Sequence, residues 1–331
     1  MKLSVILFFS CICAFLFQPG EPKHHIEEAS GVCVSKDYIY IGFESSTGNY
    51  LKLKKKDINT NCVLHLNNCD ELEQDSFEIC KFPLDVESIE SDDQGRIFLL
   101  SELTRSVYSS NGVELVLPDE FSEVGGKGAE GIALKPFKNV KNAYESVVVW
   151  EGGFMDTRKL MVDFKVPLFN CYDSVYQVTY NPRFRIDTFP ILNMNKSVKT
   201  KKTKKLNLDS LYSWTTTHYS YPKDTTIHIG YRATDVVWYK NELVVLLSAA
   251  RRSTKEDTIY FDLKVLQKFD REGNPTSSPY DLKVHRRTMC QKLNWEGMDW
   301  YEENESLVFV NDAPSDKPTQ LVFLNYPDTL K

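Results

Sequence analysis

The chain has 331 residues, of which 42% are apolar and 26% charged, a composition that excludes an intrinsically disordered protein. Its 46 Asp and Glu outnumber its 40 Lys and Arg, and the formal net charge of −6 argues against nucleic acid as a partner. Its 17 Tyr and 19 Phe favour β structure.

The first 20 residues are predicted to form a secretory signal peptide. Lys2 precedes an apolar run over 5–17 that is broken only by Ser10, and the chain turns polar at Gln18. This run is shorter than the roughly 20 apolar residues that a membrane-spanning helix needs. We therefore expect a secreted or periplasmic protein with a mature chain over 21–331, no transmembrane segment in that mature chain, and a monomeric state.

The cysteine content agrees with export. Six cysteines follow the predicted signal peptide, and an even number in an exported chain permits three disulfide bonds. Cys62 and Cys69 flank a polar turn over 66–68 and are the best candidates for a local disulfide bond. The alternative is that several of these cysteines are buried free thiols.

A repeated unit is the strongest pattern in the chain. Each copy has a short strand that begins with a small or acidic residue, then a polar turn and a second strand rich in β-formers, which is typical of a hairpin. The copies span 29–44, 86–102, 129–151, 234–248 and 295–312. A further apolar strand follows most copies, at 106–112, 175–182, 266–273 and 321–327.

Two hairpins make a four-stranded blade, the unit of a β-propeller. The copies start at intervals of 57, 43, 105 and 61 residues (30→87→130→235→296), and the long interval is expected to hold one degenerate copy over 178–191. Six units of about 50 residues fit the mature chain. The sequence therefore predicts an all-β fold with one propeller domain of six four-stranded blades over 21–331; a pair of β-sandwiches is the alternative.

Acidic residues occupy the same place in most copies. Glu87, Glu130, Asp235 and Glu296 begin four of them, and Ser30 begins a fifth. Because the innermost strands of a propeller surround its central channel, these side chains should meet at one mouth, where carboxylates repel unless protonated, paired or bound to a metal. Ca²⁺ accepts 6–8 oxygen ligands and would relieve the repulsion. Alternatively, the carboxylates accept backbone N–H groups of neighbouring blades.

Three stretches carry a family resemblance. They are Asp85-Val86-Glu87-Ser88-Ile89 with Ser101-Glu102, Gly128-Ala129-Glu130-Gly131-Ile132-Ala133, and Asn294-Trp295-Glu296-Gly297-Met298 with Asn311-Asp312. Their order and spacing over 28–326 resemble the phytase-like propeller family, known as "esterase-like activity of phytase". The resemblance implies a secreted or periplasmic six-bladed propeller that acts on phosphate or carboxylic esters with Ca²⁺.

Three arginines follow or flank the strands of the repeats. If strand ends of different blades meet at one face, Arg158, Arg232 and Arg251 would surround the carboxylates, and guanidinium groups suit phosphate oxygens. The alternative is that they form surface ion pairs. The leading hypothesis is therefore a metal-dependent hydrolase of a small anionic ester, with no catalytic residue assigned. The other hypothesis is a non-catalytic secreted propeller that binds a glycan, a peptide or a protein as its extracellular ligand.

Overall fold

The computed structural model describes residues 26, 28–76, 84–110, 112–117, 128–136, 143–150, 153–161, 201–218, 225–227, 231–253, 258–271, 273–285, 289, 293–313 and 318–331. The predicted signal peptide over 1–20, the degenerate copy over 178–191, and Cys80, Cys171 and Cys290 lie outside these ranges.

The described residues form five antiparallel sheets. The first sheet contains β1 (Ala29–Val34), β2 (Tyr38–Phe43), β3 (Asn49–Lys54) and β5 (Glu73–Ser76). The second contains β6 (Val86–Ser91), β7 (Ile97–Ser101), β8 (Ser106–Ser109) and β9 (Gly112–Val116). The third contains β10 (Ala129–Pro136), β11 (Ala143–Trp150), β12 (Gly153–Met161) and β13 (Lys201–Lys205).

The fourth sheet contains β15 (Arg232–Tyr239), β16 (Glu242–Ser253), β17 (Thr258–Phe269) and β18 (Tyr280–Asp281), and β14 (Thr225–Ile227) pairs with the far part of β16. The fifth contains β19 (Asn294–Tyr301), β20 (Ser306–Asp312), β21 (Gln320–Asn325) and β4 (Leu64–His65). Helix α3 (Asp209–His218) precedes β14. At ten residues, this longest helix of the described ranges could not reach across a bilayer.

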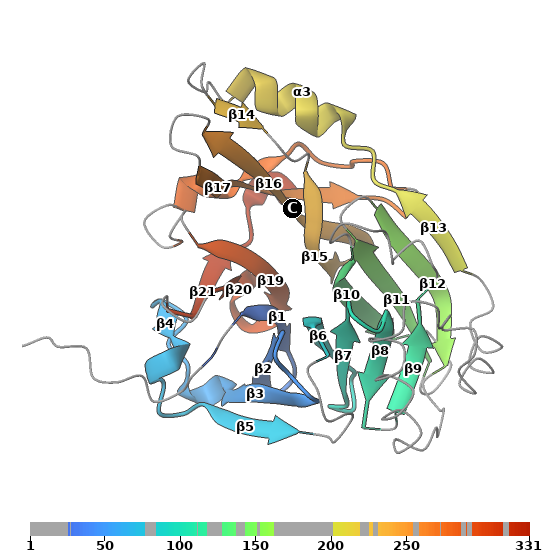
Figure 1. Cartoon of the computed structure of the whole chain (residues 1–331), viewed down its shortest axis with the longest axis vertical. Coiled ribbons are helices and arrows are strands. Elements are labelled where there is room, and N and C mark those ends of the chain that lie inside the picture. The colour runs from blue at the N-terminus through green and yellow to red at the C-terminus, as the bar shows by residue number, and fades with distance from the viewer. Residues whose placement is uncertain are drawn as a thin grey trace, which may run out of the picture.

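The five sheets are arranged as blades of a propeller around one axis (Figure 1). The innermost strands β1, β6, β10, β15 and β19 each pack against the next, and β19 packs against β1, so their ring is closed. This arrangement confirms the predicted all-β propeller and excludes two stacked β-sandwiches. The predicted six blades are not confirmed, because β10 packs directly against β15. Within the long interval between them, β13 and β14 extend the third and fourth sheets.

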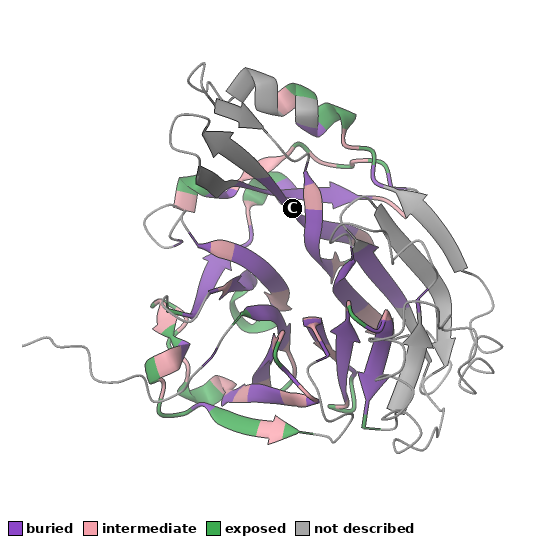
Figure 2. Ribbon diagram, in the orientation of Figure 1, coloured by how far each residue is buried: buried purple, intermediate pink, exposed green. Residues whose placement is uncertain are grey.

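Hydrophobic clusters fill the spaces between neighbouring sheets. Trp295 and Phe309 of the fifth sheet pack with Val244 and Leu246 of the fourth, and Leu211 of α3 joins the cluster between the third and fourth sheets. Figure 2 shows that burial is greatest around the axis and falls toward outer strands such as β5. The inner strands are therefore held from both sides, which fixes the positions of the side chains at the mouth of the channel.

An N-terminal strand completes the last sheet. β4 pairs with β21, Leu66 N–H donates to Thr319 O over 3.0 Å, and Thr319 N–H donates to Asn67 Oδ1 over 2.8 Å. The predicted bond between Cys62 and Cys69 is wrong in this structure, where the two are not joined as a disulfide. The segment that these cysteines flank is held by the pairing of β4 with β21 instead.

Candidate metal centre

A β-bulge recurs at the same point of every inner strand. The pairing of each inner strand with its neighbour shifts by one residue there, leaving one extra residue opposite the partner strand. The extra residues are Ser30, Glu87, Glu130, Thr234 and Glu296. This register confirms that Ser30, Glu87, Glu130 and Glu296 are equivalent, and corrects the fourth repeat, where Thr234 and not Asp235 holds the equivalent position.

Glycine follows the bulge where two inner strands approach most closely. A Cβ atom on Gly131 would lie 2.5 Å from Asp235 Oδ1, and one on Gly297 would lie 2.9 Å from Ser30 O. Both distances are too short for a side chain, so these glycines allow the close backbone approach expected at a crowded axis.

Carboxylates at or near the strand ends of the first, second and fifth sheets meet at one mouth of the channel. One oxygen each of Glu44, Glu87 and Glu296 lies within 4.8 Å of the others, and a second group of the same kind joins Glu87 with Asp85 and Glu102. Glu87 belongs to both groups. Oxygen ligands at such spacing from separate strands suit a hard divalent cation such as Ca²⁺.

Burial and mutual repulsion shift the acids at this mouth. Burial raises the pKa of Glu44 to about 8, and the charges of Glu28, Asp312 and Asp85 add to the rise. Burial, followed by the charges of Glu130 and Glu44, raises the pKa of Glu87 well above its ordinary value. Ionising these carboxyl groups therefore costs free energy when no cation is bound. A bound divalent cation would relieve the repulsion among the ionised groups.

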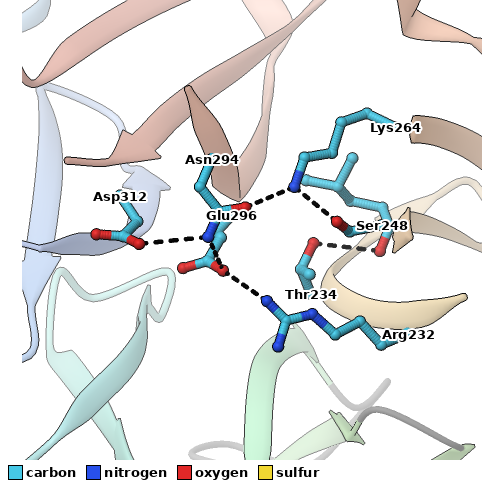
Figure 3. A network of polar contacts seen from close by, with 8 residues as sticks. Arg232, Thr234, Ser248, Lys264, Asn294, Glu296 and Asp312 are labelled. Carbon is cyan, nitrogen blue, oxygen red and sulfur yellow. Dashed lines mark hydrogen bonds and ion pairs between the residues drawn. The ribbon is translucent and has the colours of Figure 1, made fainter. Parts of the chain in front are cut away.

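Basic and amide groups border the cluster on the side of the fourth sheet (Figure 3). Arg232 Nη2 lies 3.3 Å from Glu296 Oε1. The buried Lys264 donates from Nζ to Ser248 Oγ and to Asn294 Oδ1, each over 2.7 Å. Burial lowers the pKa of Lys264 to about 7, against the opposing effect of Glu296. The mouth thus joins a group of acids to two basic side chains.

Asp235 lies in the wall between blades and not in this group of acids. Its Oδ2 accepts Met298 N–H over 2.6 Å, and its Oδ1 accepts Val236 N–H over 2.8 Å. Ser88, which follows the bulge in the second sheet as Asp235 does in the fourth, accepts Ile132 N–H of the next sheet over 3.3 Å. At this position the expected alternative is confirmed, since the side chain accepts a backbone N–H of the neighbouring blade.

A second group of titratable side chains lies three residues further along the inner strands. Ligand atoms of Cys33, Glu90 and Asp299 lie within 4.8 Å of one another. Glu90 Oε2 accepts Leu134 N–H over 3.2 Å, and Asp299 Oδ2 accepts Val34 N–H over 2.5 Å. These two carboxyl groups therefore tie β6 to the backbone of β10 and β19 to the backbone of β1.

The second group should make stability depend on pH. Burial raises the pKa of Glu90 to about 8 and that of Asp299 to about 7, both above their values in an unfolded chain. A carboxyl group whose pKa is higher in the folded state than in the unfolded chain stabilises the fold in its protonated form. Its contribution to the free energy of unfolding is fully present at acid pH and is lost as the pH rises through about 8. We expect the free energy of unfolding, measured by urea titration in EDTA, to fall between pH 5 and 9. The fall should be shallower for Glu90→Gln; an unchanged slope would contradict this assignment.

The three arginines predicted to bind an anion lie in different strands. Arg232 lies beside Glu296 and forms an ion pair with it, as the alternative expected of the arginines, and its predicted anion-binding role stays a prediction. Arg158 lies in β12 and Arg251 in β16, where Arg251 pairs with Ile227 and Tyr260. β12 is a strand of the third sheet and β16 a strand of the fourth, and the side chains of Arg158 and Arg251 lie outside those that the structure describes.

The sequence reasoning missed Glu44, Lys264 and Asp312. Glu44 follows the end of β2, and Asp312 ends β20. In an antiparallel hairpin, the end of the second strand lies beside the start of the first, as the pairing of Asn294 with Asp312 shows. Acidic residues at the ends of second strands were therefore a usable signal. Lys264 carries no such signal, because only the pairing of β16 with β17 brings it beside Ser248.

Comparisons with known proteins do not assign an activity. No family model matches the chain, and neither does any curated protein. Similar solved structures include a streptogramin B lyase, with 8% identity and a TM-score of 0.37 over 91% of this chain and 95% of that one. A virginiamycin B lyase from Staphylococcus aureus has 10% identity and a TM-score of 0.31 over 88% of this chain and 80% of that one. A glycosyl hydrolase from Bacteroides ovatus has 10% identity and a TM-score of 0.42 over 94% and 87%.

Proposed function

We propose that this chain is an exported β-propeller that binds a divalent cation, Ca²⁺ in the first instance, and hydrolyses phosphate or carboxylic esters at the mouth of its channel. The observation that carries the proposal is the convergence of Glu44, Glu87 and Glu296, whose oxygens lie within 4.8 Å of one another. The resemblance of the three acidic repeats to phytase-like propellers supports the ester substrate.

The charge balance at the mouth supports a cation. Eight carboxyl groups belong to this cluster or interact electrostatically with it: Glu28, Glu44, Asp85, Glu87, Glu102, Glu130, Glu296 and Asp312. Arg232 and Lys264 are basic groups of the described residues in the same network. The acids outnumber these basic groups, and a divalent cation would reduce the excess of negative charge that arises when the acids are ionised.

The residues present suit ester hydrolysis. A bound divalent cation polarises an ester oxygen and lowers the pKa of a water molecule. Arg232, which is partly exposed beside Glu296, can contact an anionic group of the substrate without leaving the mouth.

Hydrolysis of p-nitrophenyl phosphate and p-nitrophenyl acetate tests this proposal. We expect turnover in Ca²⁺, loss in EDTA, and a decrease of roughly 100-fold for Glu296→Gln. Glu302→Gln, a matched change of an exposed glutamate in the turn after β19, should retain native activity. Hydrolysis that resists EDTA would remove the cation from the reaction. A chain that binds Ca²⁺ without hydrolysing either ester would favour the non-catalytic binding propeller.

A further inference from the structure

We infer that Asp312 is an additional ligand of the cation site, and that Asn294, held by Lys264, is the positioning residue that orients Asp312 and Glu296 toward the ion. This inference rests on the cation site of the proposed function. It adds to that site the carboxylate of Asp312, at the end of β20. It also adds Asn294 and Lys264, which orient the carboxylates and do not bind the ion themselves.

Asp312 presents an unused acceptor at the mouth. Its Oδ2 accepts Asn294 Nδ2–H over 3.3 Å, whereas its Oδ1 is buried and has no hydrogen-bond partner among the described residues. Buried carboxylate oxygens without a donor are rare, and an ion is one of the few groups that can satisfy them. Asp312 lies beside Glu296, because Asn294 Nδ2 donates to an oxygen of each, and its charge raises the pKa of both Glu44 and Glu296.

The orientation of the Asn294 amide follows from Lys264. In its charged form Lys264 only donates hydrogen bonds, and Asn294 turns Oδ1 toward Lys264 Nζ, at 2.7 Å. Nδ2 is then left to donate to Glu296 Oε1 over 2.6 Å and to Asp312 Oδ2 over 3.3 Å. Figure 3 shows Asn294 between the two carboxylates. The amide nitrogen of Asn294 thus donates to one oxygen of each carboxylate. The other oxygen of each is then available to coordinate the cation.

Lys264 is fixed in turn by the fourth sheet. It is 3% exposed, and Ser248 Oγ takes a second of its hydrogen bonds over 2.7 Å. Because β16 and β17 pair directly at Ser248 and Lys264, the hydroxyl group that accepts from the ammonium group belongs to the residue opposite Lys264 in the sheet. The chain Ser248–Lys264–Asn294 therefore sets the direction in which Glu296 and Asp312 face.

Terbium luminescence of the full chain separates a positioning role from a merely structural one. Tb³⁺ replaces Ca²⁺ at oxygen sites, and its lifetimes in H₂O and D₂O report the number of coordinated water molecules. We expect Asn294→Leu to weaken Tb³⁺ binding by roughly 10-fold or more and to add about one coordinated water. Asp312→Asn should weaken binding similarly. The double variant should lose less than the two single losses combined, because both changes act on one ligand.

Lys268→Met is the control for the loss of a buried polar side chain outside the mouth, since Lys268 is buried in β17 and pairs with Glu242. It should leave the affinity and the water count unchanged. If the native chain binds Tb³⁺ and both single variants match it in affinity and water count, the inference fails and the cation site stands. If the native chain binds neither Tb³⁺ nor Ca²⁺, the cation site fails and the inference with it. If Asn294→Leu does not fold, the affinity and water count of Asp312→Asn alone decide whether the inference holds.

Discussion

Glu87→Gln is expected to stabilise the cation-free protein and, at the same time, to abolish tight cation binding. Burial and the charges of Glu130 and Glu44 raise the pKa of Glu87 in the folded state, so its ionised form is disfavoured there. At pH 8 in EDTA, a neutral isostere should raise the melting temperature by roughly 2–4 °C. The gain should vanish toward pH 5, where Glu87 is already protonated in the folded protein.

Calorimetry and calcium titration of the same variant measure the two effects. Glu87 belongs to both groups of acids at the mouth, so its loss should reduce Ca²⁺ affinity by roughly 100-fold. Glu302→Gln should change neither quantity. If Glu87→Gln melts below the native chain in EDTA at pH 8, Glu87 stabilises the cation-free fold. That result would contradict its assignment as a cation ligand that destabilises the fold when no cation is bound.

Asp235→Ala should have the opposite pattern, with a large loss of stability and no change in cation affinity. The substitution leaves the N–H groups of Met298 and Val236 without their acceptor in a buried wall. We expect a loss of about 2–4 kcal/mol in the free energy of unfolding, measured by urea titration.

Two comparison variants sharpen this result. Asp235→Asn keeps one acceptor oxygen and should lose less stability than Asp235→Ala. Ser88→Ala removes the equivalent acceptor of the second sheet, at 3.3 Å from Ile132 N, and should cost about 1 kcal/mol. If Asp235→Ala instead weakens Ca²⁺ binding and leaves stability intact, Asp235 is a ligand and its assignment to the wall is mistaken.

The repeats predicted the hairpins and the ring of inner strands, but not the number of blades. Each copy found in the sequence begins with an inner strand of the structure, because alternating apolar residues and polar turns are local features. The interval between β10 and β15 was expected to hold a copy of its own. Two of its described segments, β13 and β14, are additional strands of neighbouring sheets, a result of long-range pairing that periodicity does not encode.

The bulge explains why three of the four predicted acids were aligned correctly and one was not. Glu87, Glu130 and Glu296 are the extra residues of their strands, whereas Asp235 comes one residue later than Thr234. The repeat pattern in the sequence does not show a shift of one residue at the bulge. Such a shift turns the side chain from the mouth of the channel to the wall between blades.

Metal analysis of the purified full chain tests the central claim most directly. After extensive dialysis against metal-free buffer and reloading with Ca²⁺, inductively coupled plasma mass spectrometry should find about one calcium ion per chain in the native protein and far less in Glu87→Gln. Native protein and Glu87→Gln with the same calcium content, or native protein with none, would contradict the assignment of Glu44, Glu87 and Glu296 as a cation site.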